Sequence, residues 1–338
     1  MSRALKVKLF LIDNLIWVVV LGFFLINAAV TPRFSSYENI VNIFYHSAIM
    51  SMLVLGQGMI MMIGRLDLSL ESTLVIAPGI AMLAATRWIP GGLDPLVAIG
   101  LTLGVGAAVG WFNGLCVARI GVNHFLQTLS VMIFLRGMAY FMLPFAVFPL
   151  PAVYSWLGRA RTVGNVPVAV VVMVITFIVT HLVMRSTAFG RYFMATGGNP
   201  RASFIAGIDT SRMLMWAFVM GGVLAAIAGL FTAGRVDSVG STMGEGYVLL
   251  SFAGAILGGA SLSGGKGTPI GMLGGALLLG MFSNALNLRG VEVTLVYAIK
   301  GALIFVAIVL DREKERLRNY LLHQEQVRRL LAETATVA

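Results

Sequence analysis

Long apolar runs alternate with short polar breaks along almost the whole chain. A membrane-crossing helix needs about 20 consecutive apolar residues, so each long run is predicted to be a span. Ten runs qualify, and they cover residues 11–30, 44–63, 69–86, 96–117, 125–149, 167–184, 213–233, 247–262, 269–287 and 293–310. Pro78 and Gly79 are expected to interrupt the third helix, and the eighth run is short enough to be a broken or re-entrant helix.

The composition changes this picture little. Of the 338 residues, 58% are hydrophobic and 11% are charged, whereas soluble domains have about 45 to 50% and about 25%. A soluble multi-domain enzyme is therefore excluded. The single Cys116 excludes a disulfide framework, and four scattered histidines offer little for a metal site. We expect an all-α integral membrane protein without cofactors, with one transmembrane domain (residues 1–310) and a basic tail (residues 311–338).

The distribution of Lys and Arg predicts the topology. Arg3, Lys6 and Lys8 precede the first run, which is too long for the core of a signal peptide and is predicted to be a span. With the N-terminus in the cytoplasm, the inner loops hold sixteen Lys and Arg, the outer loops six and the spans two. Inner loops are usually the positive ones. The net charge of +10 is thus interpreted as a topology signal, with an even number of spans and both termini cytoplasmic.

Groups that could drive chemistry are scarce. The segment GGASLSGGKGTP (residues 258–269) differs from a phosphate-binding loop because Ala260 replaces the first glycine and Gly267 replaces the Ser or Thr. Arg136 and Lys300 are the only charged residues well inside the predicted spans. The lack of carboxylates there argues against a proton relay. His46 and His181 have no carboxylate or cysteine nearby in sequence, so a membrane-embedded enzyme is not supported.

Neutral polar side chains are present in the spans instead. They are Gln57, Asn113, Gln127, Thr128, Ser130, Asn284 and Asn287. Such groups suit an uncharged, hydroxyl-rich solute, or they hold helices together across the bundle, and both interpretations stay open. Gly267, Gly271 and Gly275 recur at four-residue spacing, which favours close packing of two helices.

A predicted inner loop, residues 195–212, has the pattern of a complete short helix. Asn199 suits the N-cap, Pro200 the first helical position and Gly207 the C-terminal stop. Phe204 and Ile205 supply apolar surface that a solvated loop does not need. They either dock onto a cytoplasmic partner or pack back on the bundle.

Four segments together resemble one family, the permease subunits of bacterial ATP-binding-cassette importers for ribose, xylose, arabinose, galactose and related sugars. The segments are RLDLSLEST (65–73), FLQTLSVMIFLRGMAY (125–140), GRYFMATGGNPRASFIAGI (190–208) and LGGASLSGGKGTPIGMLGGALLLGMFSNALNLRGV (257–291). The resemblance implies an inner-membrane importer of a monosaccharide or similar polyhydroxylated solute. The implied importer has two permease chains, identical or different, surrounded by lipid. Two cytoplasmic ATPase subunits and a periplasmic binding protein complete it. The permease itself performs no covalent chemistry.

The resemblance also implies roles for individual residues. The segment similar to the family's coupling helix, which sits in a groove of the ATPase, holds Asn199, Pro200, Arg201, Phe204, Ile205 and Gly207. The candidates for the translocation pathway are Gln57, Asp67, Ser69, Asn113, Thr128, Asn284 and Asn287.

The chain departs from the family pattern at several positions. Arg65 and Glu71 stand where the family usually has Gly, His124 stands where Pro is frequent, and residues 248–250 replace a commonly acidic stretch. Glu71 either favours a helix dipole or pairs with Arg65. Two alternatives stay open for the function: the same architecture importing nucleosides or branched-chain amino acids, and an ion-coupled secondary carrier.

Overall fold

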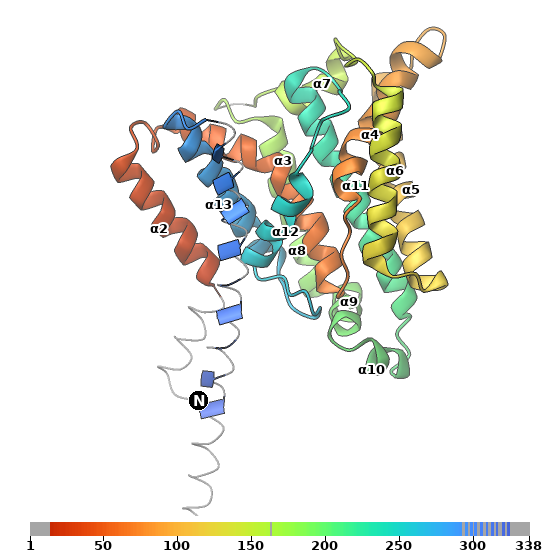
Figure 1. The fold of residues 1–338 in the computed structure, drawn as a ribbon, viewed down its shortest axis with the longest axis vertical. Coiled ribbons are helices and arrows are strands. Elements are labelled where there is room, and N and C mark those ends of the chain that lie inside the picture. The colour runs from red at the N-terminus through yellow and green to blue at the C-terminus, as the bar shows by residue number, and fades with distance from the viewer. Residues whose placement is uncertain are drawn as a thin grey trace, which may run out of the picture.

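The computed structural model of the chain is a bundle of helices (Figure 1). It describes residues 14–162 and 164–292, with isolated residues between 295 and 324. The α-helices are α2 (Leu15–Val30), α3 (Tyr37–Met62), α4 (Leu70–Leu83), α5 (Pro95–Leu115), α6 (His124–Met142), α7 (Ala152–Arg159), α8 (Val168–Ser186), α9 (Ala188–Gly198), α10 (Pro200–Ile205), α11 (Thr210–Val236), α12 (Tyr247–Leu257) and α13 (Pro269–Leu288). Two π-helical turns, η1 (Ala84–Trp88) and η2 (Cys116–Ile120), extend α4 and α5. In these residues the only β-structure is two isolated bridges.

Six of these helices are long and apolar enough to cross a membrane, and they identify a multi-pass membrane protein. They are Tyr37–Met62, Pro95–Ile120, His124–Met142, Val168–Ser186, Thr210–Val236 and Pro269–Leu288. α2 and α12 are apolar but shorter. The all-helical fold class predicted from the sequence is confirmed, and every predicted span up to residues 269–287 contains a helix. Lys300 and most of residues 293–338, which include the predicted last span and tail, lie outside the described residues.

Two expectations about individual spans are wrong. α4 is not interrupted at Pro78, which lies inside the helix. Proline has no N–H to bond to the carbonyl four residues earlier, which here is the carbonyl of Leu74. This carbonyl packs against Gly229 of α11, where an added Cβ atom would lie 2.3 Å from its oxygen. The fifth span, predicted for residues 125–149, ends as a helix at Met142. The following stretch leaves the helix to pair Val147 with Val239.

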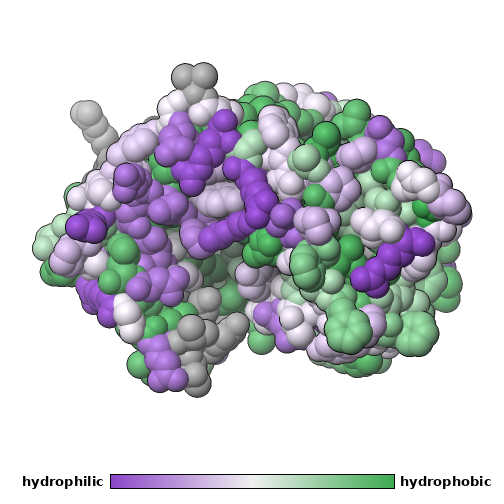
Figure 2. Space-filling view, turned by 90° about the horizontal axis from the view of Figure 1, so that it is seen from above, coloured by the Kyte–Doolittle hydropathy of each residue, from purple (hydrophilic) through white to green (hydrophobic). Residues whose placement is uncertain are grey.

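α3 and α11 form the centre of the bundle, as Figure 1 shows. In α3, 78% of the apolar window is buried within the chain, compared with 11% in α6. The outward faces of α6 and α8 carry large exposed apolar side chains, including Phe134, Phe141 and Ile175. Seen from the α7 end, hydrophilic residues gather over one part of the molecule, while hydrophobic residues lie around the rest (Figure 2). The exposed apolar side chains of α6 and α8 are those expected of a protein with lipid around its sides.

The glycines of α13 bring it into contact with α12. A Cβ atom at Gly271 would lie 2.2 Å from the carbonyl oxygen of Gly258, and one at Gly275 would lie 2.0 Å from that of Gly254. No side chain fits at either position, so the two backbones touch. The packing interpretation of the glycine stripe is therefore confirmed.

Candidate functional site

The short helix α10 projects from one end of the bundle, beyond α9 (Figure 1). The side chain of Asn199 caps it by accepting a hydrogen bond from the backbone N–H of Ala202 at 3.0 Å, and Pro200 occupies its first turn. Gly207 follows with φ +82°, the left-handed conformation that ends a helix. The local structure predicted for this loop is therefore confirmed.

The apolar side chains of α10 do not pack back on the bundle. Phe204 is 71% exposed and Ile205 is 81% exposed. Ser203, in the same helix, is buried. Arg201 is exposed on the same short helix. The sequence left open whether these side chains pack back on the bundle or dock onto a partner. Their exposure excludes packing on the bundle.

A glycine junction joins the end of α9 to the end of α3. A Cβ atom at Gly197 would lie 1.9 Å from the carbonyl oxygen of Met62. The same oxygen accepts a hydrogen bond from the N–H of Gly265 at 2.8 Å. Gly264 packs on the other side, where a Cβ would lie 2.4 Å from the Gly197 carbonyl oxygen. The end of α9 and the last turn of α3 are therefore in direct backbone contact.

The connection that follows α3 carries a buried polar cluster. Asp67 is 1% exposed, and its Oδ1 accepts hydrogen bonds from the backbone N–H and the hydroxyl of Ser69 at 2.7 and 2.6 Å. The Asn113 amide donates to the Ser69 hydroxyl at 2.8 Å, and Gln127 donates to Asn113 at 3.4 Å. Three of the predicted pathway residues, Asp67, Ser69 and Asn113, thus meet in one place.

The Asp67 carboxyl lies outside both neighbouring helices but is cut off from water. Burial, which disfavours the charged form, raises its pKa to about 6, and hydrogen bonds from Ser69 and Asn113 lower it by less. Its Oδ2 has no hydrogen-bond partner among the described residues. This carboxyl is the most perturbed acid near the α10 end of the bundle.

The other predicted pathway residues do not belong to this polar cluster. Thr128 is buried and bonds to the His124 carbonyl of its own helix at 2.8 Å. Asn284 forms a reciprocal amide pair with Asn39 at 2.9 and 3.0 Å, which joins α13 to α3. Gln57 is fully buried, and neither of its amide atoms has a partner among the described residues. Asn287 is exposed and lines a cavity.

That cavity lies between α3, α11, α12 and α13, and it encloses about 180 Å³. Its lining residues are His46, Ile49, Met50, Arg235, Tyr247, Leu250, Leu279, Gly280, Phe282, Ser283 and Asn287. Nη1 and Nη2 of Arg235 each lie 2.8 Å from a ring nitrogen of His46. Sequence analysis could not find this pair, because its members are 189 positions apart and Arg235 counts only as a loop charge in the topology.

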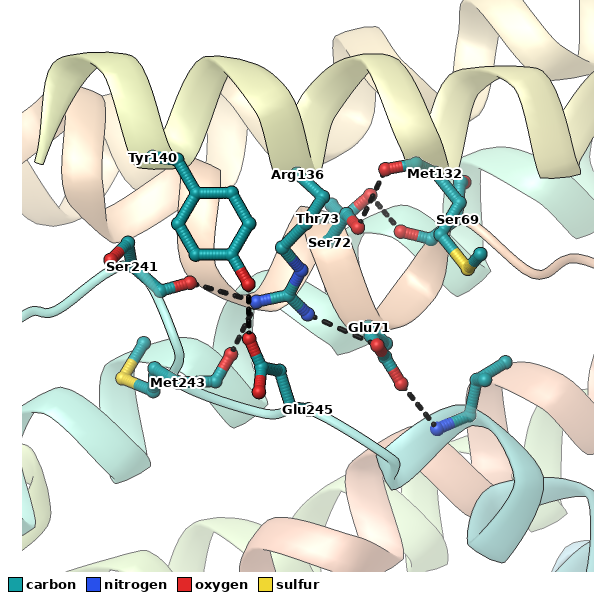
Figure 3. A network of polar contacts seen from close by, with 11 residues as sticks. Ser69, Glu71, Ser72, Thr73, Met132, Arg136, Tyr140, Ser241, Met243 and Glu245 are labelled. Atoms are coloured by element: carbon teal, nitrogen blue, oxygen red, sulfur yellow. Dashed lines mark hydrogen bonds and ion pairs between the residues drawn. The ribbon is translucent and has the colours of Figure 1, made fainter.

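A charged network lies on the other side of α12 (Figure 3). Glu71 forms an ion pair with Arg136 at 3.1 Å, and its second oxygen accepts a hydrogen bond from the N–H of Val248 at 3.2 Å. Arg136 also donates to the carbonyls of Ser241 and Met243 at 2.8 and 3.2 Å. The suggested pairing of Glu71 with Arg65 is therefore wrong.

The two charged side chains can meet because α4 packs along α6. In Figure 3 the guanidinium of Arg136 points from α6 toward both Glu71 and the segment before α12. Arg65 bonds instead to the carbonyl of Gly64 at 3.0 Å. The network ties α4, α6 and the start of α12 together, and it leaves Arg136 with a counter-charge from its own chain.

Comparison with known proteins places these features in context. Residues 39–308 match the family described as the permease component of the branched-chain amino acid transport system. The ribose import permease protein of Escherichia coli is 32% identical over 321 residues, which cover 93% of this chain and 98% of that protein. The fructose import permease protein of Rhizobium meliloti is 30% identical, covering 87% of this chain and 83% of its own length. The L-arabinose transport system permease protein of Escherichia coli is 31% identical, with 87% and 89% covered. No solved structure matches the chain.

Proposed function

The chain belongs to the family of permease components of the branched-chain amino acid transport system type, and from this premise we propose that it carries a monosaccharide or similar polyhydroxylated solute into the cytoplasm. It does so as the transmembrane subunit of an ATP-binding-cassette importer, driven by a separate ATPase. The observation that carries this function is the likeness to ribose, fructose and arabinose permeases over most of both chains.

The exposed surface of α10 supports coupling to an ATPase. A helix that buries neither Phe204 nor Ile205 in its own chain suits the groove of a partner, where such side chains act as anchors. The glycine junction at Gly197 gives that partner a rigid route to α3. In this arrangement Asn199, Pro200 and Gly207 shape the coupling helix, Phe204 and Ile205 contact the ATPase, and Arg201 lies beside them.

The charges within the bundle favour a sugar over an amino acid. A zwitterion asks for groups of complementary charge in its path. Arg136, the cation inside α6, is already paired with Glu71 and bonded to two carbonyls. The neutral side chain of Asn287 is exposed and lines a cavity, and an amide suits hydroxyls.

The finer architecture follows from the same function. The chain has ten spans in one transmembrane domain of residues 1–310, with a basic tail of residues 311–338 and both termini in the cytoplasm. The α10 end faces the cytoplasm, which agrees with the excess of Lys and Arg in the loops on that side. A second permease chain completes the pathway in the inner membrane, and a periplasmic binding protein delivers the solute to the opposite end.

Two measurements on the intact assembly test this function. The tagged chain, purified from bacterial membranes in mild detergent, is expected to bring down an ATPase with a phosphate-binding loop, identified by mass spectrometry. The assembly in proteoliposomes is then expected to take up ribose, arabinose or fructose only with ATP. Uptake that survives without ATP but collapses with an uncoupler contradicts the importer and favours a secondary carrier. Uptake of leucine but of no sugar contradicts the solute class.

A further inference from the structure

The cavity between α3, α11, α12 and α13 has one polar side and one apolar side. The polar groups come from His46, Arg235, Tyr247, Ser283 and Asn287, and the apolar wall comes from Ile49, Met50, Leu250, Leu279 and Phe282. His46 and Asn287 are exposed, so the cavity is open to a solute. Binding sites for small molecules commonly combine an apolar wall with a few fixed polar groups.

Arg235 is held in place without a carboxylate. Its guanidinium carbon lies 4.8 Å from the centre of the Tyr45 ring, and both of its terminal nitrogens contact His46. The Tyr45 hydroxyl in turn donates to the Gly158 carbonyl. The neighbouring carboxylate of Asp237 pairs with Arg159 at 3.0 Å instead. Within the described part of the chain, Arg235 therefore lies beside the cavity without a carboxylate partner.

Close helix packing gives the cavity a firm floor. A Cβ atom at Gly280 would lie 1.9 Å from the hydroxyl oxygen of Ser47, so α3 and α13 touch directly beneath it. On the far wall, Tyr247 and Leu250 belong to the first turns of α12. That turn is fixed from behind by Glu71, which accepts the Val248 N–H. The polar groups are thus presented by elements that hold their positions before any solute arrives.

The size of the cavity corresponds to one small solute. The volume of about 180 Å³ limits the occupant to a single small molecule. A guanidinium presents five N–H donors and an amide presents both donors and an acceptor, a set that matches adjacent hydroxyls. Tyr247 and Phe282 add rings for the apolar face of a sugar.

We propose that this cavity is a binding site of the permease itself for one monosaccharide, with Arg235 and Asn287 bonding to its hydroxyls and His46 holding Arg235 in place. The assignment rests on the proposed function, because it takes the solute to be a sugar. It goes further by placing a site of its own in the permease, separate from that of any delivering protein. Its described lining holds no Asp or Glu to receive an ammonium group, which favours a sugar over an amino acid.

Direct binding to the isolated permease tests the site. The full chain is purified without ATPase or binding protein, and equilibrium dialysis with radiolabelled ribose, arabinose and fructose is carried to high millimolar concentration. The wild type is expected to bind at least one of these sugars saturably. Arg235→Gln and Asn287→Ala should each weaken it by about tenfold or more, as expected for a lost hydrogen bond from a charged or well-placed polar group.

Arg161→Gln is the matched control, because Arg161 is another arginine near Tyr45 that does not line the cavity. It should bind sugar as the wild type does. Where Arg235→Gln fails to fold, Asn287→Ala at the exposed rim decides the result. The site is overturned if the wild type binds none of the sugars saturably, or if Asn287→Ala binds as the wild type does.

Uptake by the whole assembly separates the two conclusions. ATP-driven sugar uptake by the wild type together with unchanged binding by the cavity variants would remove this site and leave the importer intact. Absence of sugar uptake by a complete, ATP-hydrolysing assembly would overturn the proposed function instead. In the assembly the cavity variants are expected to alter the order of preference among the three sugars, which a merely structural defect does not do.

Discussion

Glu71 and Arg136 form an ion pair at 3.1 Å that joins α4 to α6 inside the bundle. Their side chains are only 12% and 13% exposed, and Glu71 also accepts the N–H of Val248 at the first turn of α12. The carboxylate therefore sits between a guanidinium and the positive end of a short helix. This charge receives one of the free N–H groups in the first turn of α12.

Removing the charge of Glu71 should cost stability. Glu71→Gln leaves the guanidinium of Arg136 largely buried without a counter-charge, a change that typically costs about 3 to 5 kcal/mol. The thermal unfolding midpoint of the purified protein in detergent is expected to fall accordingly. A double variant with Arg136→Met should lose less than the sum of the two single variants, because neither charge is then left alone.

An exposed ion pair provides the control for that experiment. Arg212 and Asp209 lie 3.4 Å apart with side chains 70% and 53% exposed, and such pairs contribute about 0 to 1 kcal/mol. Arg212→Gln keeps the Asp209 cap of α11 and should leave the midpoint nearly unchanged. Equal effects of Glu71→Gln and Arg212→Gln would contradict the importance given to the buried pair.

The exposed surface of α10 predicts a loss of coupling without a loss of folding. Phe204→Asp places a charge on a side chain that is 71% exposed, so the isolated permease should insert and melt as the wild type does. ATPase co-purification and ATP-driven uptake should both fall below detection, because a charge is costly in an apolar groove. Phe204→Leu keeps the surface apolar and should retain both. Wild-type uptake by Phe204→Asp would remove α10 from the contact.

Asp67 predicts a specific dependence of stability on pH. Its pKa is about 6 in the folded protein, compared with about 3.9 in an unfolded chain. As the pH rises through this window the unfolded chain loses its proton first. The free energy of unfolding therefore falls between about pH 4 and pH 6, by up to about 3 kcal/mol, and stays low above pH 6.

Asp67→Asn should remove this dependence. The variant keeps an acceptor for Ser69 but has no charge to bury. Its gain in the free energy of unfolding over the wild type should therefore be absent near pH 4 and largest at pH 7.5. Unfolding midpoints of both proteins across that range measure the difference. Parallel pH curves for the two proteins would show that the carboxyl has the same pKa in the folded and the unfolded chain.

Local features were predictable from the sequence. Hydrophobic runs located the helices, and the Asn199, Pro200 and Gly207 pattern located α10, because a cap bonds to a residue only three positions away. The shortness of α12 was visible in its apolar run. The end of α6 was missed, since residues 143–149 are apolar enough to continue the helix yet pair with the distant Val239.

Contacts between distant residues could not be predicted in the same way. Glu71 lies 65 positions from Arg136, and Arg235 lies 189 positions from His46. Neither spacing has a periodic signature, because each depends on which helices become neighbours. The neutral polar residues also looked alike in the sequence. Only the structure separates Asn284, which bonds to Asn39, from Asn287, which lines the cavity.

The glycine junction predicts that coupling can be broken while the ATPase stays bound. Gly197→Ala adds a Cβ atom that would lie 1.9 Å from the Met62 carbonyl oxygen, so the end of α9 must move away from α3, at a typical cost of about 1 to 3 kcal/mol. The surface of Phe204 and Ile205 is untouched, so ATPase co-purification and ATP hydrolysis should persist while sugar uptake falls severalfold. Gly198→Ala is the matched control, because the nearest atom to its Cβ lies at 3.9 Å, and it should transport normally. Similar uptake by the two variants would show that the contact between Gly197 and Met62 does not transmit the movement of α10.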